Sequence, residues 1–425
     1  FTRAHIPGGT CGAVCMPSRA MLHTGRTLFH LDREGQEIPA AHVTMGEQFR
    51  RAGYATHGIG KWHNGKAAFA RGFSGGDEIF FGGMADHWNV PVHRFDPTGR
   101  YEGRCARTVD PFHSNRVEWS DADHIAGGRH STDLLTDAAV RFLRDRSRAA
   151  PFFLYVSLLA PHDPRTMPRR FRDLYDPASI ELPPNFLRAH PIDTGALRIR
   201  DELLAAWPRD PAEIRRHIAE YFAMITHLDD AFGRLMAVLR ETGEEENTIV
   251  VMAGDNGLAV GQHGLMGKQS LYEHSVRVPL LFAGPGIPAN ARRADLVYLL
   301  DLFPTLCDLC GLPVPESVEG RSLVPALGGA GTGSARSHLY LAYERSIRGV
   351  TDGRIKLIEY ACGATQLFDL VEDPAETRNR AGDPAWRGRL TEFRARLRSL
   401  AEEWEDERHP AGRAFWADRH RQGVF

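Results

Sequence analysis

The spacing of apolar residues along the chain predicts helices that alternate with buried strands. Over residues 132–144 the apolar positions return every three or four residues, which is the period of an amphipathic helix. Residues 212–242 keep this period for longer and predict a second helix. The apolar face of that helix would consist of Ile214, Ile218, Tyr221, Ile225, Leu228, Phe232 and Leu235. The runs 152–159, 248–253 and 279–283 are almost continuously apolar, which is typical of strands buried on both faces of a parallel sheet.

Capping and turn residues add further elements. Thr44 as an N-cap, with Glu47 as its capping-box partner and Gly53 as the stop, predicts a helix over residues 44–51. A short strand over 54–59 should follow. Residues 73–130 show little periodicity and are expected to be a loop region. Its candidates for contact with a ligand are His87, Trp88, Asn89, His93 and Arg94.

The pattern changes at about Ser334. Short apolar runs separated by turn residues predict an antiparallel meander with strands at 338–343, 347–351, 355–360 and 366–370. A helix over 386–404 should follow, and the tail from His409 has no clear element. The sequence therefore predicts an α/β fold: a large, mostly parallel sheet flanked by helices, within residues 1–333. A smaller C-terminal α+β subdomain with an antiparallel sheet and a helix should occupy residues 334–425.

Composition is that of an ordinary globular protein of 425 residues, with 42% apolar and 25% charged residues. The formal net charge of −2 gives no global attraction to nucleic acid or to an anionic membrane, and neither is expected as a partner. No apolar run is long enough to span a bilayer. The six cysteines are too few for a disulfide scaffold.

The stretch from Cys11 to Arg26 carries the first candidate chemistry. Pro17 suits the first turn of a helix and Gly25 its end, so Cys15 should lie just before the helix N-terminus. Backbone N–H groups there favour an anion, and Arg19 lies one turn further along. A single cysteine near a helix start is more often a small buried residue than a nucleophile. The residues around Cys15 favour the nucleophile only when they are taken together.

Polar groups follow three of the predicted strands. Lys61 and His63 follow the strand at 54–59, His162 follows the next one, and Asp255 with Asn256 follows the run 248–253. Each group alone has an ordinary explanation as a surface charge or a turn former. Carboxyl ends of parallel strands share one edge of a sheet, however, and ligands bind at that edge. We therefore expect these groups to meet the Cys15 loop.

These motifs resemble those of the sulfatase family. Cys15-Met16-Pro17-Ser18-Arg19 with Thr24-Gly25-Arg26 is similar to the family signature C-x-P-S-R…T-G-R, and only His23 departs from the usual Leu or Met. Gly60-Lys61-Trp62-His63 resembles the family G-K-W-H, and Pro161-His162 its P-H after a buried strand. Gly254-Asp255-Asn256-Gly257 followed by Lys268 resembles the metal pair and the lysine that follows it. Further landmarks are Tyr272-Glu273, Arg277-Val278-Pro279, Leu367-Phe368-Asp369-Leu370 and Asp373-Pro374.

The resemblance implies an alkaline-phosphatase/sulfatase-like fold and hydrolysis of sulfate esters, with a sulfated carbohydrate as the expected substrate. Family members oxidise the signature cysteine, here Cys15, to formylglycine, whose hydrate attacks sulfur. A formylglycine-generating enzyme is thus an expected partner. Arg19 would hold the hydrate, and His63 would assist the expulsion of sulfate. The remaining implied roles belong to Lys61 and Lys268, which would neutralise sulfate oxygens, and to His162 or Lys268, which would protonate the leaving oxygen.

Two alternatives remain open at this point. A phosphonate monoester or phosphodiester hydrolase of the same superfamily would use the same nucleophile. A catalytically inactive protein that binds sulfated glycans would need no nucleophile at all. Export to the periplasm or the outside of the cell is favoured by analogy with the family, and the signal region is expected to lie outside the chain.

The resemblance also implies a Ca²⁺ site with Asp255 and Asn256 as two oxygen ligands. The family uses two further acidic residues on a first strand, and residues 1–14 contain no Asp or Glu. That strand is therefore expected to be missing from the chain, which then holds about half of the ligands. We predict poor Ca²⁺ binding and little activity for the 425-residue polypeptide, and recovery of both when the natural upstream segment is added. Calorimetric titration with Ca²⁺ and an activity assay test this, and full activity of the 425-residue form would contradict it.

Overall fold

A computed structural model describes residues 1–110, 112–328 and 336–424. The chain forms two compact units, of which the first comprises residues 1–35, 181–215 and 249–425 and the second residues 36–180 and 216–248. The predicted domain boundary at 333/334 lies outside the described residues, so the division into residues 1–333 and 334–425 stays a prediction. The predicted α/β class with a smaller antiparallel C-terminal sheet is confirmed.

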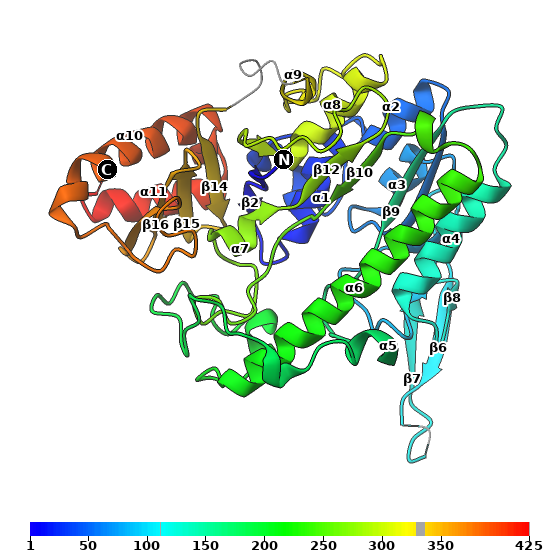
Figure 1. The fold of residues 1–425 in the computed structure, drawn as a ribbon, viewed down its shortest axis with the longest axis horizontal. Helices are drawn as coiled ribbons and strands as arrows, with labels where there is room; N and C mark the ends of the chain where they lie inside the picture. The colour runs from blue at the N-terminus through cyan, green and yellow to red at the C-terminus, as the bar shows by residue number, and fades with distance from the viewer. Residues whose placement is uncertain (111, 329–335, 425) are drawn as a thin grey trace. The chain divides into compact units, whose positions relative to one another are not determined.

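The second unit is built on a parallel sheet in the order β4-β3-β9, with strands Gly75–Phe80, Ala55–Lys61 and Phe152–Ser157 (Figure 1). Helix α4 (Ser131–Asp145) packs on one face, where Phe142 stacks on His57 at 4.3 Å between ring centroids. Helix α3 (Lys66–Gly72) lies on the opposite face and brings the Phe69 ring against Gly58. A Cβ at Gly58 would come within 2.6 Å of that ring, so this close packing requires a glycine.

The capping residues chosen from the sequence start helix α2 (Met45–Arg51). The Thr44 hydroxyl accepts a hydrogen bond from the Glu47 backbone N–H at 3.2 Å, and the Thr44 N–H donates to the Glu47 carboxylate. Both halves of the predicted capping box are therefore present. The remaining short elements of this unit are α5 (Arg169–Arg172), η3 (Pro177–Ser179) and η5 (Glu245–Asn247).

Residues 73–130 were predicted to be irregular, and this is wrong. They contain β4 and two short antiparallel pairs of strands. These pairs are β5 (Pro91–Val92) with β8 (His124–Ile125), and β6 (Arg104–Thr108) with β7 (Val117–Asp121). None of the residues of β6 or β7 is buried, and the apolar residues of β6 are adjacent rather than alternating, so the hairpin has no clear strand period.

Helix α6 (Pro211–Glu241) is continuous over 31 residues, but its predicted apolar face is only partly buried. Ile214 is fully buried, whereas Ile225 and Phe232 are 42% and 39% exposed. The other buried apolar positions of the helix are Ile218, which belongs to the predicted face, and Ala219, Ala223, Met224, Ala231, Val238 and Leu239. The small residues that contribute to this buried face weaken the apolar period on which the prediction depended.

In the first unit the strands of the α/β part form two short sheets. Strand β10 (Val250–Ala253) pairs antiparallel with β12 (Leu280–Ala283), and β1 (Ala4–His5) lies between β11 (Arg277–Val278) and β13 (Val297–Tyr298). The prediction that β10 is buried on both faces is wrong, because Met252 is 47% exposed. Strand β9 in the second unit is likewise only half-buried over most of its length.

Helix α1 (Cys15–Thr24) and short helical segments complete the first unit outside the C-terminal sheet. The other segments are η1 (Leu28–His30), η2 (Asp32–Gly35), η4 (Arg200–Leu204), α7 (Glu273–Val276), η6 (Leu299–Asp301), α8 (Leu302–Leu309) and α9 (Val324–Leu327). Cys307 in α8 is fully buried and unpaired, as expected for a core residue.

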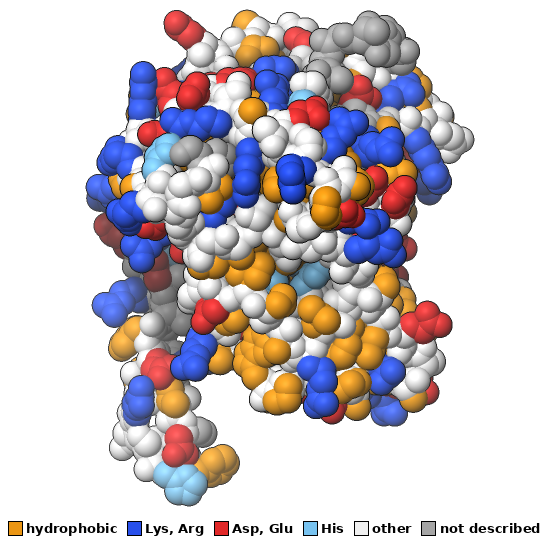
Figure 2. Space-filling model, turned by 90° about the vertical axis from the view of Figure 1, so that its left-hand side faces the viewer, with side chains coloured by type: hydrophobic (Ala, Val, Ile, Leu, Met, Phe, Trp, Pro, Cys, Tyr) orange, Lys and Arg blue, Asp and Glu red, His pale blue; other side chains and the backbone are white. Residues whose placement is uncertain are grey.

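The predicted meander is confirmed as the five-stranded sheet β17-β16-β15-β14-β2. Its strands are Thr365–Asp369, Ile355–Tyr360, Ile347–Thr351, Leu339–Tyr343 and, from the start of the chain, Gly8–Gly9. Helix α10 (Arg387–Glu403) packs on one face together with α11 (Pro410–Arg421), after η7 (Pro384–Trp386) and η8 (Asp406–Arg408) (Figure 1). Figure 2 shows the left-hand side of the molecule as drawn in Figure 1. On this face Lys and Arg side chains are interspersed with Asp and Glu, in keeping with the small net charge.

The tail after His409, predicted to lack structure, forms helix α11. The His409 side chain accepts the Ala411 N–H and Pro410 occupies the first turn, which are both helix-start signals. Phe415 and Trp416 are buried against the sheet. Only a few apolar residues take part, so the period was too weak to predict the helix.

The end of α1 is fixed by a carboxylate from a distant loop. Gly25 ends the helix in a left-handed conformation with φ 65°, and its carbonyl accepts the N–H groups of Glu319 and Gly320 at 2.9 Å. The Glu319 carboxylate accepts the Thr27 N–H at 2.6 Å and contacts His30 Nδ1 at 2.6 Å. Burial alone would raise the pKa of Glu319, but the hydrogen bonds from His30 and Thr27 lower it to about 2. The hydrogen bond to Glu319 raises the pKa of His30 above 6.5.

We expect Glu319→Gln to lower the free energy of unfolding by about 1–2 kcal/mol near pH 5.5, after allowance for partial exposure of the pair. The contribution of Glu319 is present above its unfolded pKa of 4.5 and is lost as the pH falls toward 2. That of His30 is complete below 6.5 and is lost as the pH rises through its raised pKa. Urea unfolding should show the largest loss between pH 4.5 and 6.5 and a smaller one in alkaline buffer. An equal loss in both ranges would contradict this assignment.

Candidate active site

Cys15 is the first residue of α1, and its side chain is only 4% exposed. Pro17 lies in the first turn, where its missing N–H leaves no intrahelical partner unsatisfied. The neighbouring Cys11 is less buried, and burial raises the pKa of its thiol to about 12. His23, the departure from the family signature, is fully buried on the same helix, and burial lowers its pKa to about 3. It is therefore a neutral core residue.

Arg19 and Asp255 form the central contact of the first unit. Arg19 Nε donates to Asp255 Oδ2 at 2.7 Å, and Arg19 is 6% exposed. The Ser18 hydroxyl donates to the backbone carbonyl of Asp255 at 2.5 Å. Asn256 donates its side-chain N–H to the other carboxylate oxygen of Asp255 at 2.9 Å. The structure thus brings together Arg19, Asp255 and Asn256, and it gives the signature serine a role that the sequence did not reveal.

Lys268 lies in a loop that is held by buried groups on its N-terminal side. The Glu202 carboxylate accepts the N–H groups of Met266 at 3.0 Å and Gly267 at 2.9 Å. The Arg209 guanidinium pairs with this carboxylate and donates to the Gly264 carbonyl at 3.0 Å. Lys268 itself is 7% exposed.

Gln269 ties the same loop to the segment that precedes Cys15. Its side-chain N–H donates to the Gly12 carbonyl at 3.0 Å, and the contact spans 257 residues of sequence. Its side-chain oxygen accepts the Lys268 N–H at 2.8 Å. No motif or spacing in the sequence indicates Glu202 or Gln269, because both act on backbone groups far along the chain.

In the second unit, Lys61 and His63 lie at the carboxyl end of β3. Lys61 is the last residue of the strand, and its ammonium group donates to the Gly83 carbonyl at 2.6 Å. His63 has a φ of 77°, a conformation that is uncommon for residues other than glycine and that concentrates at functional sites. Trp62 between them points into the core, where its indole N–H donates to the Gly65 carbonyl at 2.8 Å.

His162 follows the neighbouring strand β9, whose Ser157 pairs with Gly60 of β3. The ends of both strands therefore lie at one edge of the parallel sheet, as the sequence predicted. His162 Nδ1 contacts the Asp163 backbone carbonyl at 3.0 Å and its carboxylate at 3.1 Å. This pairing orients the ring, and an oriented ring is what a proton donor requires.

Two of the predicted ligand-contacting histidines are instead core residues. His87 is 1% exposed; its ring contacts the Ser131 hydroxyl at 2.7 Å and donates to the His162 carbonyl at 2.9 Å. His93 is equally buried. Burial lowers the pKa of both rings. The charge-neutral ring of His87 supports the turn that carries His162.

Asp255 and Asn256 are suited to a hard cation by donor type, and their role as two Ca²⁺ ligands stays a prediction. Ca²⁺ takes about six to eight oxygen ligands, and both carboxylate oxygens of Asp255 are already hydrogen-bonded to Arg19 and Asn256. The described ranges 1–110, 112–328 and 336–424 contain no group of three or more His, Cys, Asp or Glu side chains placed to hold a metal ion. These two residues are thus not a calcium site by themselves.

Comparison with known proteins decides the family. The sulfatase family model matches residues 1–312, and the model for the C-terminal part of N-sulphoglucosamine sulphohydrolase matches residues 261–403. The chain belongs to the sulfatase family. It is a sulfuric ester hydrolase of the alkaline phosphatase superfamily, as its motifs predicted.

Curated relatives cover most of this sulfatase chain. A sulfatase of Formosa agariphila is 25% identical and aligns with 100% of the chain and 84% of its own length. An N-acetylglucosamine-6-O-sulfatase of Bacteroides thetaiotaomicron is 24% identical over 93% of the chain and 79% of its own length. A solved structure bound to its substrate D-glucosamine-2-N,6-O-disulfate shares the fold, with a TM-score of 0.74, 21% identity and coverage of 96% and 90%. No helix within the described ranges of this sulfatase has both the length and the apolar composition that a bilayer crossing requires.

Proposed function

We propose that this sulfatase cleaves sulfate esters of a carbohydrate with a formylglycine made from Cys15. The observation that carries the proposal is the start of α1: Cys15 begins a buried helix whose next turn places Arg19 on Asp255 at 2.7 Å. A helix N-terminus and a fixed guanidinium next to one side chain are suited to an anionic ester. The modification replaces the –CH₂SH group of Cys15 by –CHO, and addition of water gives a hydrate with two hydroxyls.

The hydrate provides both nucleophile and exit route. One hydroxyl loses its proton to water as its oxygen bonds to sulfur, the bond from sulfur to the ester oxygen breaks, and the alcohol leaves with a proton from a general acid. The second hydroxyl then loses its proton as its carbon–oxygen bond becomes a carbonyl. At the same time the bond between this carbon and the sulfate oxygen breaks, and sulfate leaves. Water adds to the aldehyde and restores the hydrate. A serine at this position would lack the second hydroxyl and would remain sulfated.

The other proposed roles rest on the family motifs and on the charge and chemistry of each side chain. Arg19 would hold the hydrate, since its guanidinium is buried and already oriented by Asp255. Lys61 and Lys268 are almost fully buried ammonium groups, which would neutralise sulfate oxygens through charge-assisted hydrogen bonds. His63 would take the proton of the second hydroxyl. His162, oriented by Asp163, would protonate the leaving oxygen, with Lys268 as the alternative donor.

A carbohydrate substrate is supported by the relatives. One of them is named for removal of a 6-O-sulfate from N-acetylglucosamine, and a structural neighbour was solved with a disulfated glucosamine. The C-terminal family model is also named for a sulphoglucosamine sulphohydrolase. We therefore propose a sulfated amino sugar as the first substrate class to test.

Peptide mass spectrometry across Cys15, after co-expression with a formylglycine-generating enzyme, tests the nucleophile. Conversion of the thiol to the aldehyde should lower the residue mass by about 18 daltons. With Ca²⁺ and the predicted upstream segment supplied, the modified protein should hydrolyse 4-nitrophenyl sulfate and glucosamine 6-sulfate, and Cys15→Ala should lose this activity by at least about a thousandfold. Cys11→Ala is the matched control and should keep both the modification and the activity. An unmodified Cys15, under conditions in which a control sulfatase is converted, would overturn the mechanism.

The same preparations separate the ester classes. Rates on 4-nitrophenyl sulfate should exceed those on a phenylphosphonate monoester and on a phosphodiester. Faster cleavage of the phosphorus esters would make the chain a phosphonate or phosphodiester hydrolase of the superfamily. Binding of sulfated glycan without turnover, unchanged in Cys15→Ala, would instead favour a binding protein.

A further inference from the structure

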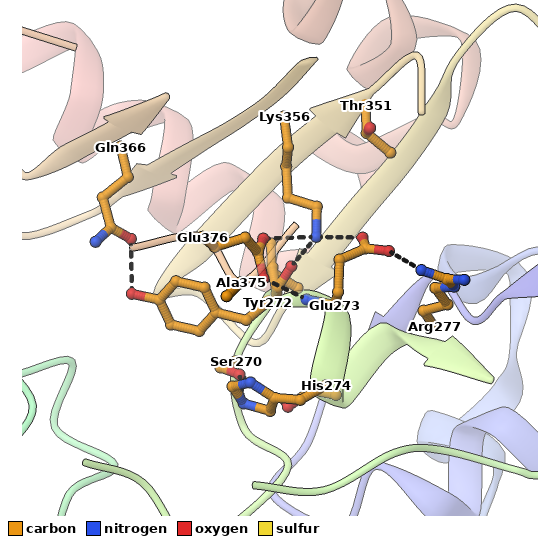
Figure 3. Close-up of polar contacts among 12 residues, drawn as sticks. Ser270, Tyr272, Glu273, His274, Arg277, Thr351, Lys356, Gln366, Ala375 and Glu376 are labelled. Atoms are coloured by element: carbon orange, nitrogen blue, oxygen red, sulfur yellow. Dashed lines mark hydrogen bonds and ion pairs between the residues drawn. The ribbon is translucent and has the colours of Figure 1, made fainter. Parts of the chain in front are cut away.

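A buried lysine of the C-terminal sheet holds the segment that follows Lys268. Lys356 of β16 is fully buried, and its ammonium group contacts Glu273 Oε1 at 2.5 Å and Glu376 Oε1 at 3.0 Å. Its third contact is the backbone carbonyl of Leu271 at 3.0 Å, three residues after Lys268. All three contacts converge on one nitrogen atom (Figure 3).

Glu376 holds the same segment from the other side. Its second carboxylate oxygen accepts the Glu273 backbone N–H at 2.8 Å, at the start of α7. Burial raises the pKa of Glu376 to about 7 against the attraction of Lys356. Burial would also raise the pKa of Glu273, but Lys356 and His5 hold it well below its usual value. One buried ammonium group therefore fixes both a carbonyl and a carboxylate of the loop, and Glu376 fixes an N–H.

The held segment contacts the other parts of the proposed site in the same unit. The Ser275 carbonyl accepts the N–H of Gly257, directly after the Asp255–Asn256 pair, at 2.9 Å. The Val276 carbonyl accepts the Ile6 N–H at 2.8 Å, and Glu273 Oε1 lies 3.3 Å from His5 Nε2 on β1. Thus the residues between 271 and 276 join the C-terminal sheet, the Asp255 turn and the strand that leads toward Cys15.

We propose that Lys356, Glu273 and Glu376, here called the buried triad, are positioning residues that set the placement of Lys268 and of the Asp255 turn for sulfate ester hydrolysis. The proposal rests on the proposed roles of Lys268 and Asp255. None of the three residues touches the substrate in this scheme. They act through backbone contacts at Leu271, Glu273 and Ser275.

The energetics favour placement over stability as the role of the buried triad. A buried ion pair seldom stabilises a fold more than apolar residues of similar volume, because each charge has lost its hydration. The directional contacts of an ammonium group, however, fix the atoms around it, and apolar packing at the same place would leave the Leu271 carbonyl without a partner. A shift of about 1 Å at a reacting group is enough to cost about a hundredfold in rate.

The same sheet supplies a matched control. Arg348 of β15 is fully buried on the opposite face, where its guanidinium binds the equally buried Asp406 at 2.7 and 2.9 Å. Tyr340 and Trp416 also donate to this carboxylate. This second buried pair faces α10 and α11, and the Arg348 guanidinium donates to Asp406 and to the carbonyls of Glu344 and Ile347 rather than to residues 268–276.

The experiment compares two neutralised variants of the modified enzyme. In the triad variant, Lys356→Met is combined with Glu273→Gln and Glu376→Gln, so that no buried charge is left unpaired. In the control variant, Arg348→Met is combined with Asp406→Asn. Kinetics on 4-nitrophenyl sulfate and hydrogen exchange of the peptide covering residues 268–276 are measured for both, with Lys268→Ala beside them.

We expect the triad variant to fold, to lose about 10- to 100-fold in kcat with KM changed less than about threefold, and to exchange faster at residues 268–276. The control variant should lose stability but keep kcat and the exchange rate of this peptide. A folded triad variant with unchanged kcat would overturn the proposal. If the triad variant does not fold, Glu376→Gln alone decides, since it leaves the Lys356–Glu273 pair balanced; unchanged kcat and exchange there would equally overturn it. Full activity of Lys268→Ala would instead refute the proposed role of Lys268.

Discussion

The contact between Arg19 and Asp255 joins two segments that are 236 residues apart and fixes where helix α1 docks in the first unit. A buried guanidinium without a carboxylate would be strongly unfavourable, so α1 can dock only where Asp255 meets it. The Ser18 hydroxyl on the Asp255 carbonyl adds a second, directional contact to the same turn. The order of Pro17, Ser18 and Arg19 thus has a physical explanation: Pro17 suits the first turn of the helix, and Ser18 and Arg19 anchor the helix to Asp255.

Elements with strong local signals could be predicted from the sequence, and elements defined by long-range packing could not. The capping box at Thr44, the stop at Gly25 and the four-stranded meander depend on neighbouring residues and were found. Helix α11 and the hairpin β6–β7 were missed, because neither has a strong apolar period. Strand β10 was expected to be covered on both faces, yet an apolar run reports only the hydrophobicity of its residues and not whether another element covers them.

The candidate site divides in the same way. Cys15, Arg19, Lys61 and His162 stand in motifs that can be recognised from their neighbours in the sequence. The residues that hold these segments in place, Glu202, Gln269 and Lys356, do not stand in recognisable motifs. They act on backbone groups of a loop, and any side chain of the right length and charge at the same point in space could make the same contacts. His87 shows the converse error, since a histidine in a polar stretch resembles a ligand-contacting residue but supports the His162 turn from within the core.

The pairing of β2 with β14 has a consequence for the order of events during synthesis. Gly8 and Gly9 find their strand partners only at Ala342 and Tyr343, so the segment before Cys15 has no place in the sheet until most of the chain has left the ribosome. Asp255, which anchors α1, also comes long after Cys15. Once these contacts form, Cys15 is 4% exposed and closed to a large enzyme. Any catalyst that changes its thiol therefore works on a nascent or open chain, and the speed of folding sets the time available for the modification.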